Sequence, residues 1–69
     1  MTLKEIGILI EERRRLLSLR QEDLAEMSGV TVRTIRNIEQ GKGNPAFTTL
    51  EKLCDIVGLD ITVAVKTIS

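Results

Sequence analysis

The chain has 69 residues, and its ten basic and ten acidic side chains cancel to a net charge of zero. This length allows one domain, whose small core makes it marginally stable on its own. Histidine, tryptophan and tyrosine are absent and Phe47 is the only aromatic residue, so the commonest catalytic base and metal ligand is missing. We therefore expect no enzyme activity, no metal site and no cofactor.

Cys54 is the only cysteine, so a disulfide within the chain is impossible, and this usage fits a reducing cytoplasm. Cys54 shares a helical face with Leu50, Leu53 and Val57, which favours a packed core thiol over a redox sensor. The N-terminus lacks the basic region and apolar core of a signal peptide. No apolar run approaches the roughly 18 residues of a membrane span. We expect a cytoplasmic protein with no membrane contact.

Thr2 and Glu5 form a capping-box pattern that should begin the first helix. A projection at about 100° per residue gathers one apolar side, with Leu9 at its edge. That side contains Leu3, Ile6, Ile10 and Leu17. Ile8 falls on the opposite side, and two interpretations stay open: a singly exposed isoleucine, or a contact with another chain.

Residues 21–28 and 32–40 predict two short helices joined by a tight turn. Gly29 lies where the chain must reverse, and glycine adopts a positive φ there without steric cost. Leu24 and Ala25 should point inward from the first of these helices. The second has an apolar stripe at Ile35 and Ile38. Its opposite, wet face carries Arg33, Arg36, Asn37 and Gln40.

Residues 41–45 are a dense run of turn residues and predict a loop. A second capping-box pattern at residues 48–51 should begin the last helix, with Thr48 as its first cap residue. Gly58 should end that helix directly after Val57.

After Gly58 the apolar period changes to strict alternation, which predicts a half-buried β-strand over residues 59–68. Its apolar face consists of Leu59, Ile61, Val63 and Val65. A lone strand cannot satisfy its own backbone groups. The economical partner is a second copy of the chain, which would give an antiparallel ribbon across a two-fold axis. The alternative is a loosely packed extended tail.

The two helices and their turn resemble the Xre/Cro/lambda-repressor type of helix-turn-helix domain. The matching positions are Gln21, Leu24, Ala25, Gly29, Val30, Ile35, Ile38 and Glu39. The resemblance covers residues 6–57. It implies an all-α, lambda-repressor-like bundle of four to five short helices, here followed by one C-terminal strand that pairs across a homodimer. The expected division is a DNA-binding domain at residues 1–58 and a dimerisation strand at residues 59–68.

By this resemblance, Val32, Arg33 and Asn37 read bases in the major groove. Arg33 can donate two hydrogen bonds to guanine, Asn37 can bridge adenine, and Val32 can cover a thymine methyl. Arg36 could contact either a base or a phosphate. The plainer interpretation is that these polar residues only solvate a helix face.

The resemblance also gives contacts that position the domain on DNA without reading sequence. Gln21 opens a helix whose free N–H groups attract phosphate, and it should also support the second helix of the motif. Lys42, Gly43 and Asn44 should follow the sugar-phosphate backbone. The partners implied are a pseudo-palindromic double-stranded DNA operator and a second copy of the chain.

Arg14 and Glu39 match family positions that form a partly buried ion pair, which would orient the second helix of the motif. The sequence departs from the family at Arg13, where an apolar residue is usual. Either the stem of Arg13 packs while its head reaches water, or the first helix is rotated slightly.

A helix-turn-helix domain followed at once by a strand also resembles the HipB-like antitoxins, which are partners of HipA-type kinase toxins. Residues 48–65 carry this second resemblance. It implies a repressor that autoregulates a toxin–antitoxin operon. Two alternatives remain: a stand-alone phage-type or chromosomal repressor, and a protein-interaction module that has lost DNA binding. Because the chain stops at Ser69, we expect any toxin to bind the folded body. The favoured surface is the outer side of the first helix around Ile8, and the alternative is the polar side of the last helix around Lys52 and Asp55.

Overall fold

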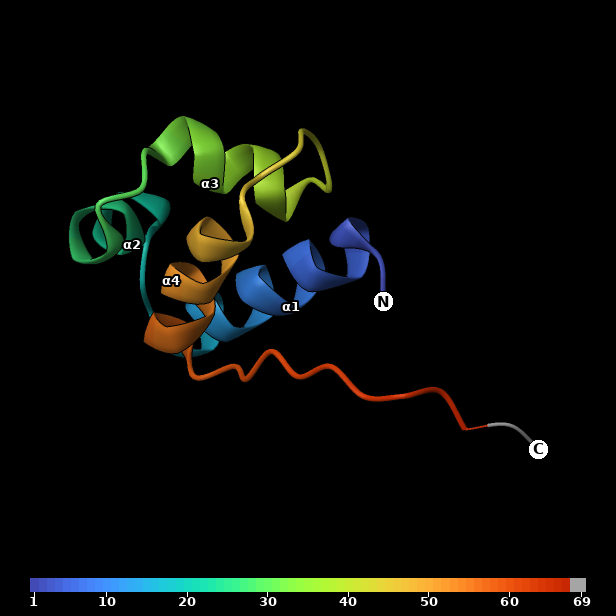
Figure 1. The fold of residues 1–69 in the computed structure, drawn as a ribbon. Helices are drawn as coiled ribbons and strands as arrows, with labels where there is room; N and C mark the ends of the chain where they lie inside the picture. The colour runs from blue at the N-terminus through green and yellow to red at the C-terminus, as the bar shows by residue number, and fades with distance from the viewer. Residues whose placement is uncertain (68–69) are drawn as a thin grey trace.

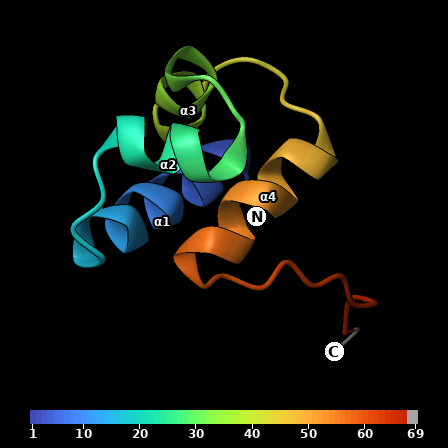
Figure 2. The same ribbon diagram turned by 90° about the vertical axis from the view of Figure 1, so that its left-hand side faces the viewer.

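The computed structural model describes residues 1–67, and residues 3–57 of this range form an all-helical bundle. Its elements are α1 (Leu3–Leu16), α2 (Gln21–Ser28), α3 (Val32–Glu39) and α4 (Phe47–Val57). Both α1 and α2 pack against α3 and against α4. In Figures 1 and 2, α3 lies on one side of this body, and the segment after α4 leaves from the opposite side. The predicted all-α class and the number of helices agree with this arrangement.

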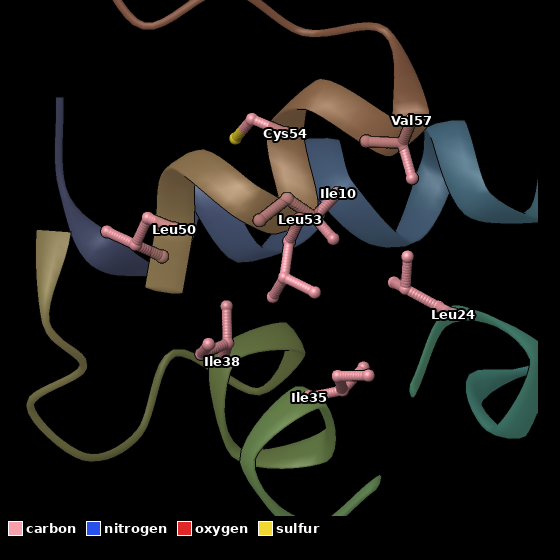
Figure 3. Close-up of a cluster of buried hydrophobic side chains, with 8 residues drawn as sticks. All are labelled: Ile10, Leu24, Ile35, Ile38, Leu50, Leu53, Cys54 and Val57. Atoms are coloured by element: carbon pink, nitrogen blue, oxygen red, sulfur yellow. The ribbon is translucent and has the colours of Figure 1, made fainter. Parts of the chain in front are cut away.

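The core is formed by apolar side chains that all four helices contribute, as Figure 3 shows. These residues are Ile10, Leu24, Ile35, Ile38, Leu50, Leu53, Cys54 and Val57. The expected helical face of α4 is therefore buried, and Cys54 packs in the core. Burial raises the pKa of the Cys54 thiol, with a smaller contribution from Asp55. A thiol in this environment is unreactive.

Three helix ends form as the sequence predicts. The Thr2 hydroxyl accepts a hydrogen bond from the Glu5 N–H at 3.2 Å, and the Glu5 carboxylate accepts one from the Thr2 N–H at 3.1 Å. Gly29 and Gly58 end α2 and α4 with φ values of 74° and 79°. Both values lie in the left-handed region that only glycine enters freely.

The start of α4 differs from the prediction. Its N-cap is Ala46, so the capping box expected from Thr48 is wrong. The Ala46 carbonyl accepts hydrogen bonds from the Thr49 and Leu50 N–H groups at 3.1 and 3.2 Å. The backbone thus begins the helix before Thr48, which lies inside the first turn, where its hydroxyl cannot act as a cap.

Leu17 is the second departure, because its side chain is exposed instead of joining the apolar side of α1. It is the C-cap residue, with φ −84° and ψ 5°. A projection at a constant angle per residue holds only within the helix, and α1 ends at Leu16. Ile8, which the projection placed outside, is 45% exposed.

Arg13, the departure from the family pattern, binds the end of α4. Its Nε donates a hydrogen bond to the Val57 carbonyl at 2.8 Å. The last carbonyls of a helix have no partner within the helix, so a cation that donates there is favourable. The head of Arg13 is therefore held against α4.

Residues 59–67 continue from α4 as an extended segment to which no strand is assigned in the described residues. Leu59 packs against the core, but Val63 and Val65 are 93% and 97% exposed. Residue 68, the last residue of the predicted strand, lies outside the described residues. An open groove of about 480 Å³ runs between this segment and Met1, Ile6 and Leu9. The strand and its partner stay predictions.

Candidate nucleic-acid interface

α2 and α3 are joined by a turn at residues 29–31, and the last residue of this turn caps α3. Thr31 is the N-cap, and its hydroxyl accepts a hydrogen bond from the Thr34 N–H at 3.2 Å. Ile35 and Ile38 are buried against the other helices. Because the buried stripe fixes the rotation of α3 about its axis, the opposite face is turned outward.

The outward face of α3 holds the residues expected to read bases. Arg33 and Arg36 are exposed, while Val32 and Asn37 are half-buried. At about 100° per residue, these four positions fall within an arc of about 140°. One face of α3 therefore presents two guanidinium groups, one amide and one small apolar side chain.

The expected phosphate-contacting loop follows α3 directly and is tied to it by backbone hydrogen bonds. The Gly41 N–H donates to the Ile38 carbonyl at 2.9 Å, and the Lys42 N–H donates to the Asn37 carbonyl at 2.8 Å. An open groove of about 190 Å³ lies between α3 and this loop. It is lined by Thr34, Asn37, Ile38, Lys42, Gly43, Asn44 and Pro45.

A buried polar network joins α1, α2 and α3 behind the outward face. Arg14 donates from Nε to Glu39 Oε2 at 2.7 Å and from Nη2 to Glu39 Oε1 at 2.9 Å. Gln21 also donates to Glu39 Oε1, at 3.1 Å. Arg14 reaches the Leu19 carbonyl as well, at 2.9 Å, a contact that sequence reasoning missed. The structure thus places the expected ion pair in a larger network that includes the first residue of α2.

This network favours the ionised forms of both Glu39 and Arg14. Burial by itself would raise the pKa of Glu39, but the hydrogen bonds from Arg14 and Gln21 outweigh it, and the pKa lies below its ordinary value. The hydrogen bond to Glu39 raises the pKa of Arg14. Opposite charges with fork-like, two-bond geometry stabilise each other in this way.

The inward pairing of Glu39 leaves the outward face positive in a chain of zero net charge. Within residues 1–67 the ion pairs are Arg14–Glu39, Arg15–Glu11 and Arg20–Asp23. None of these pairs uses Arg33, Arg36 or Lys42. Three cations are therefore available on α3 and its following loop, which suits a polyanion.

Other site types receive no support from the part of the chain that the structure describes. It contains no group of three or more histidine, cysteine, aspartate or glutamate residues that could hold a metal ion. Among residues 1–67, no helix has both the length and the apolar character needed to cross a membrane.

Two helices at a glycine turn, with a buried stripe and an outward polar face on the second, define a helix-turn-helix domain. The chain belongs to the helix-turn-helix family, whose profile matches residues 10–63. This match extends through the whole of α2, α3 and α4.

Curated relatives come from bacteria, a phage and an archaeon. The HTH-type transcriptional regulator PuuR of Escherichia coli (strain K12) is 41% identical over 56 residues, which are 81% of this chain and 30% of PuuR. The ImmF control region 10 kDa protein of Bacillus phage phi105 is 30% identical over 60 residues, 87% of this chain and 67% of that protein. An uncharacterized HTH-type transcriptional regulator of Methanothermobacter thermautotrophicus is 40% identical over 50 residues, 72% of each chain. The chain therefore spans less than a third of PuuR but most of the two smaller relatives.

Proposed function

We propose that this chain is the DNA-binding part of a transcription regulator and that α3 reads the operator. The observation that carries the proposal is the positive surface of α3 and the loop after it: Arg33 and Arg36 on α3 and Lys42 in the loop remain unpaired within the described residues, while Glu39 is bound inward. Relatives named as transcriptional regulators support the same role.

The base-reading residues are Val32, Arg33 and Asn37. Arg33 lies in the first turn of α3 and is exposed, so its guanidinium can donate two hydrogen bonds to guanine O6 and N7. Asn37 lies about one turn later and can bridge adenine N6 and N7. Arg36, between them and exposed, contacts either a base or a phosphate.

Phosphate contacts come from both sides of α3. Lys42, Gly43 and Asn44 are exposed in the loop after α3. On the other side, α2 begins at Gln21, where free backbone N–H groups and the helix dipole attract an anion. The side-chain amide of Gln21 donates its hydrogen bond to Glu39, so the backbone N–H of Gln21 is the group available for phosphate. Such contacts set the register of the domain on DNA.

The functional unit is a homodimer joined through residues 59–68, with residues 1–58 as the DNA-binding domain. The apolar side chains Val63 and Val65 are almost fully exposed in one chain, and burying them is favourable. The extended segment leaves the body on the side opposite α3, so a contact between two segments leaves both α3 helices free (Figures 1 and 2). Two copies related by a two-fold axis require a pseudo-palindromic operator with half-sites about 34 Å apart, or a multiple of that.

Selection from a pool of random DNA duplexes tests this proposal. We expect the chain to enrich a pseudo-palindrome. Arg33→Ala should weaken binding to that duplex by about 1–3 kcal/mol and relax the preference at one base pair per half-site. Lys42→Ala is the matched comparison, because it should weaken all sequences alike and lower the salt slope by about 1. If Arg33→Ala binds as tightly as the wild type with the same base preferences, α3 is not the reader. If no sequence is enriched, the chain is a protein-interaction module.

A kinase toxin of the HipA type is the finer partner proposal, which makes the regulator an antitoxin that represses its own operon. It rests on the resemblance at residues 48–65. Ile8, which is 45% exposed on α1, offers an apolar contact away from α3. Co-expression and co-purification with the adjacent reading frame tests it. No stable complex would leave a stand-alone repressor, an alternative favoured by the phage relative, most of whose length this chain covers.

A further inference from the structure

α1 meets the C-terminal end of α3 through backbone atoms as well as through the Arg14–Glu39 pair. A Cβ atom built on Gly7 would lie 2.0 Å from the Ile38 carbonyl oxygen, 3.0 Å from its carbon and 3.2 Å from the Glu39 Cα. One turn earlier on α1, Lys4 meets Gly41, where a Cβ would lie 2.9 Å from the Lys4 Cα. The end of α3 and the turn after it thus rest directly on the backbone of α1.

A glycine inside a helix needs a reason, because it is a poorer helix former than alanine. Gly7 lies in the interior of α1 and is buried. Its φ is not in the left-handed region, so backbone conformation does not demand glycine. The reason is the close approach of Ile38, since the opposing atoms belong to the backbone and no side chain can swing away.

The consequence of a side chain at this position is a displacement of α3. Carbon and carbonyl oxygen atoms of separate segments approach to about 3.3–3.6 Å, so a methyl group at 2.0 Å requires a separation of more than about 1 Å. The atoms that must move include Ile38 and Glu39. The loop moves with them, because the Gly41 and Lys42 N–H groups are bound to α3 carbonyls.

We propose that Gly7 is a positioning residue of the DNA interface, which sets how closely the end of α3 packs on α1. It thereby sets where Asn37 and the loop around Lys42 lie relative to the start of α2. This inference rests on the proposed function, because it concerns the same interface. Gly7 is buried against the backbone of Ile38 and Glu39, so it acts through α3 and does not touch DNA.

The test compares Gly7→Ala with Leu16→Ala, a control on the same helix whose side chain is 70% exposed and carries no charge. The probe is the duplex enriched by the wild-type chain. Binding is measured at several salt concentrations under conditions where circular dichroism shows the variant folded. We expect Gly7→Ala to bind about tenfold more weakly or worse, and its salt slope to fall because loop contacts are lost. Leu16→Ala should match the wild type in both measurements.

Affinity and salt slope together separate positioning from stability, because a variant that is merely less stable but folded keeps the same number of phosphate contacts. If folded Gly7→Ala has the wild-type affinity and slope, the inference is overturned while the proposed function stands. If the wild-type chain enriches no duplex, it is the proposed function that fails. Should Gly7→Ala be unfolded in buffer, binding is measured in sucrose, which favours the compact state. A variant that stays unfolded there overturns the inference, because the contact then serves the whole fold.

Discussion

The helical body at residues 3–57 buries its core apolar side chains, whereas the extended segment at residues 59–67 leaves most of its own exposed. In the body, Ile10, Leu24 and Ile35 are completely buried and come from three different helices. In the segment, Leu59 packs against the core, whereas Val63 and Val65 are exposed almost entirely. Apolar exposure therefore increases along the segment with distance from α4.

This difference shows which contacts one chain can supply. Four amphipathic helices can cover one another's apolar faces, so the body completes its core within a single chain. An extended segment at the edge of the body leaves one row of backbone groups and one row of side chains without neighbours. We infer that the body is the DNA-binding unit and that the segment is completed by a second copy.

The largest expected effect concerns the segment. Val63→Asp should weaken dimerisation by about 100-fold or more, because a carboxylate would be buried without a partner. The monomer should keep its stability, since Val63 is 93% exposed in one chain. Analytical ultracentrifugation over a range of concentrations measures the dissociation constant.

Thr62→Asp is the matched control, since its side chain falls on the other face of the predicted strand. It should leave the dimer intact. If both variants behave like the wild type in the centrifuge, the segment does not join the two copies. In that case the exposed Ile8 on α1 would be the next candidate for the contact between the two copies.

The next effect concerns the body and its buried charges. Glu39→Ala should lower the free energy of unfolding by about 3 kcal/mol, because Arg14 stays buried without its counter-charge. Replacing both residues by methionine should recover much of this loss, since apolar side chains of similar volume suit the site. Urea unfolding followed by circular dichroism measures these differences. An unchanged midpoint for Glu39→Ala would contradict the role of the pair in holding α1 to α3.

The smallest expected effect is a pH dependence of the free energy of unfolding, and it concerns the helical body. The pKa of Glu39 is lower in the folded protein than its ordinary value of 4.5, so the unfolded chain binds this proton more readily. The stability from the pair is therefore fully present well above pH 4.5 and is lost as the pH falls below it.

Glu5 and Asp23 also have lowered pKa values, because of hydrogen bonds to Thr2 and to Arg20 respectively, so the wild-type curve alone is not specific. The useful quantity is the difference in unfolding free energy between the wild type and Glu39→Gln, measured in urea at each pH. That difference should shrink as the medium is acidified. A difference that is constant with pH would show that Glu39 titrates alike in both states.

Local patterns in the sequence were sufficient for most helix positions. The Thr2–Glu5 capping box, the glycines at 29 and 58 and the spacing of Ile35 and Ile38 each act over a few residues, so their effects can be read without knowing the fold. The start of α4 was misplaced because two competing caps lay within two residues, and the backbone bonds to Ala46 prevailed over the Thr48 side chain.

For the candidate interface, too, some features could be predicted from the sequence and others could not. The outward polar face of α3 follows from periodicity, and the Arg14–Glu39 pairing was expected from the family resemblance. Contacts between residues far apart in sequence were not predictable in detail, as with the Arg13 hydrogen bond to Val57. The resemblance led us to expect that Gln21 supports α3, but it did not name Glu39 as the partner of its side-chain amide. Such contacts depend on distances between helices.

By itself, the sequence determined the helices, the glycine turn between α2 and α3, and which face of α3 is polar, because these depend on residues within one or two helical turns. Only the tertiary structure decided how closely α1 approaches α3. Gly7 carries no periodic signal beyond the absence of a side chain, and its meaning appears only when the Ile38 carbonyl occupies the space where a Cβ would be. The physical reason is that close packing is a property of two surfaces together, and one stretch of sequence specifies only one of them.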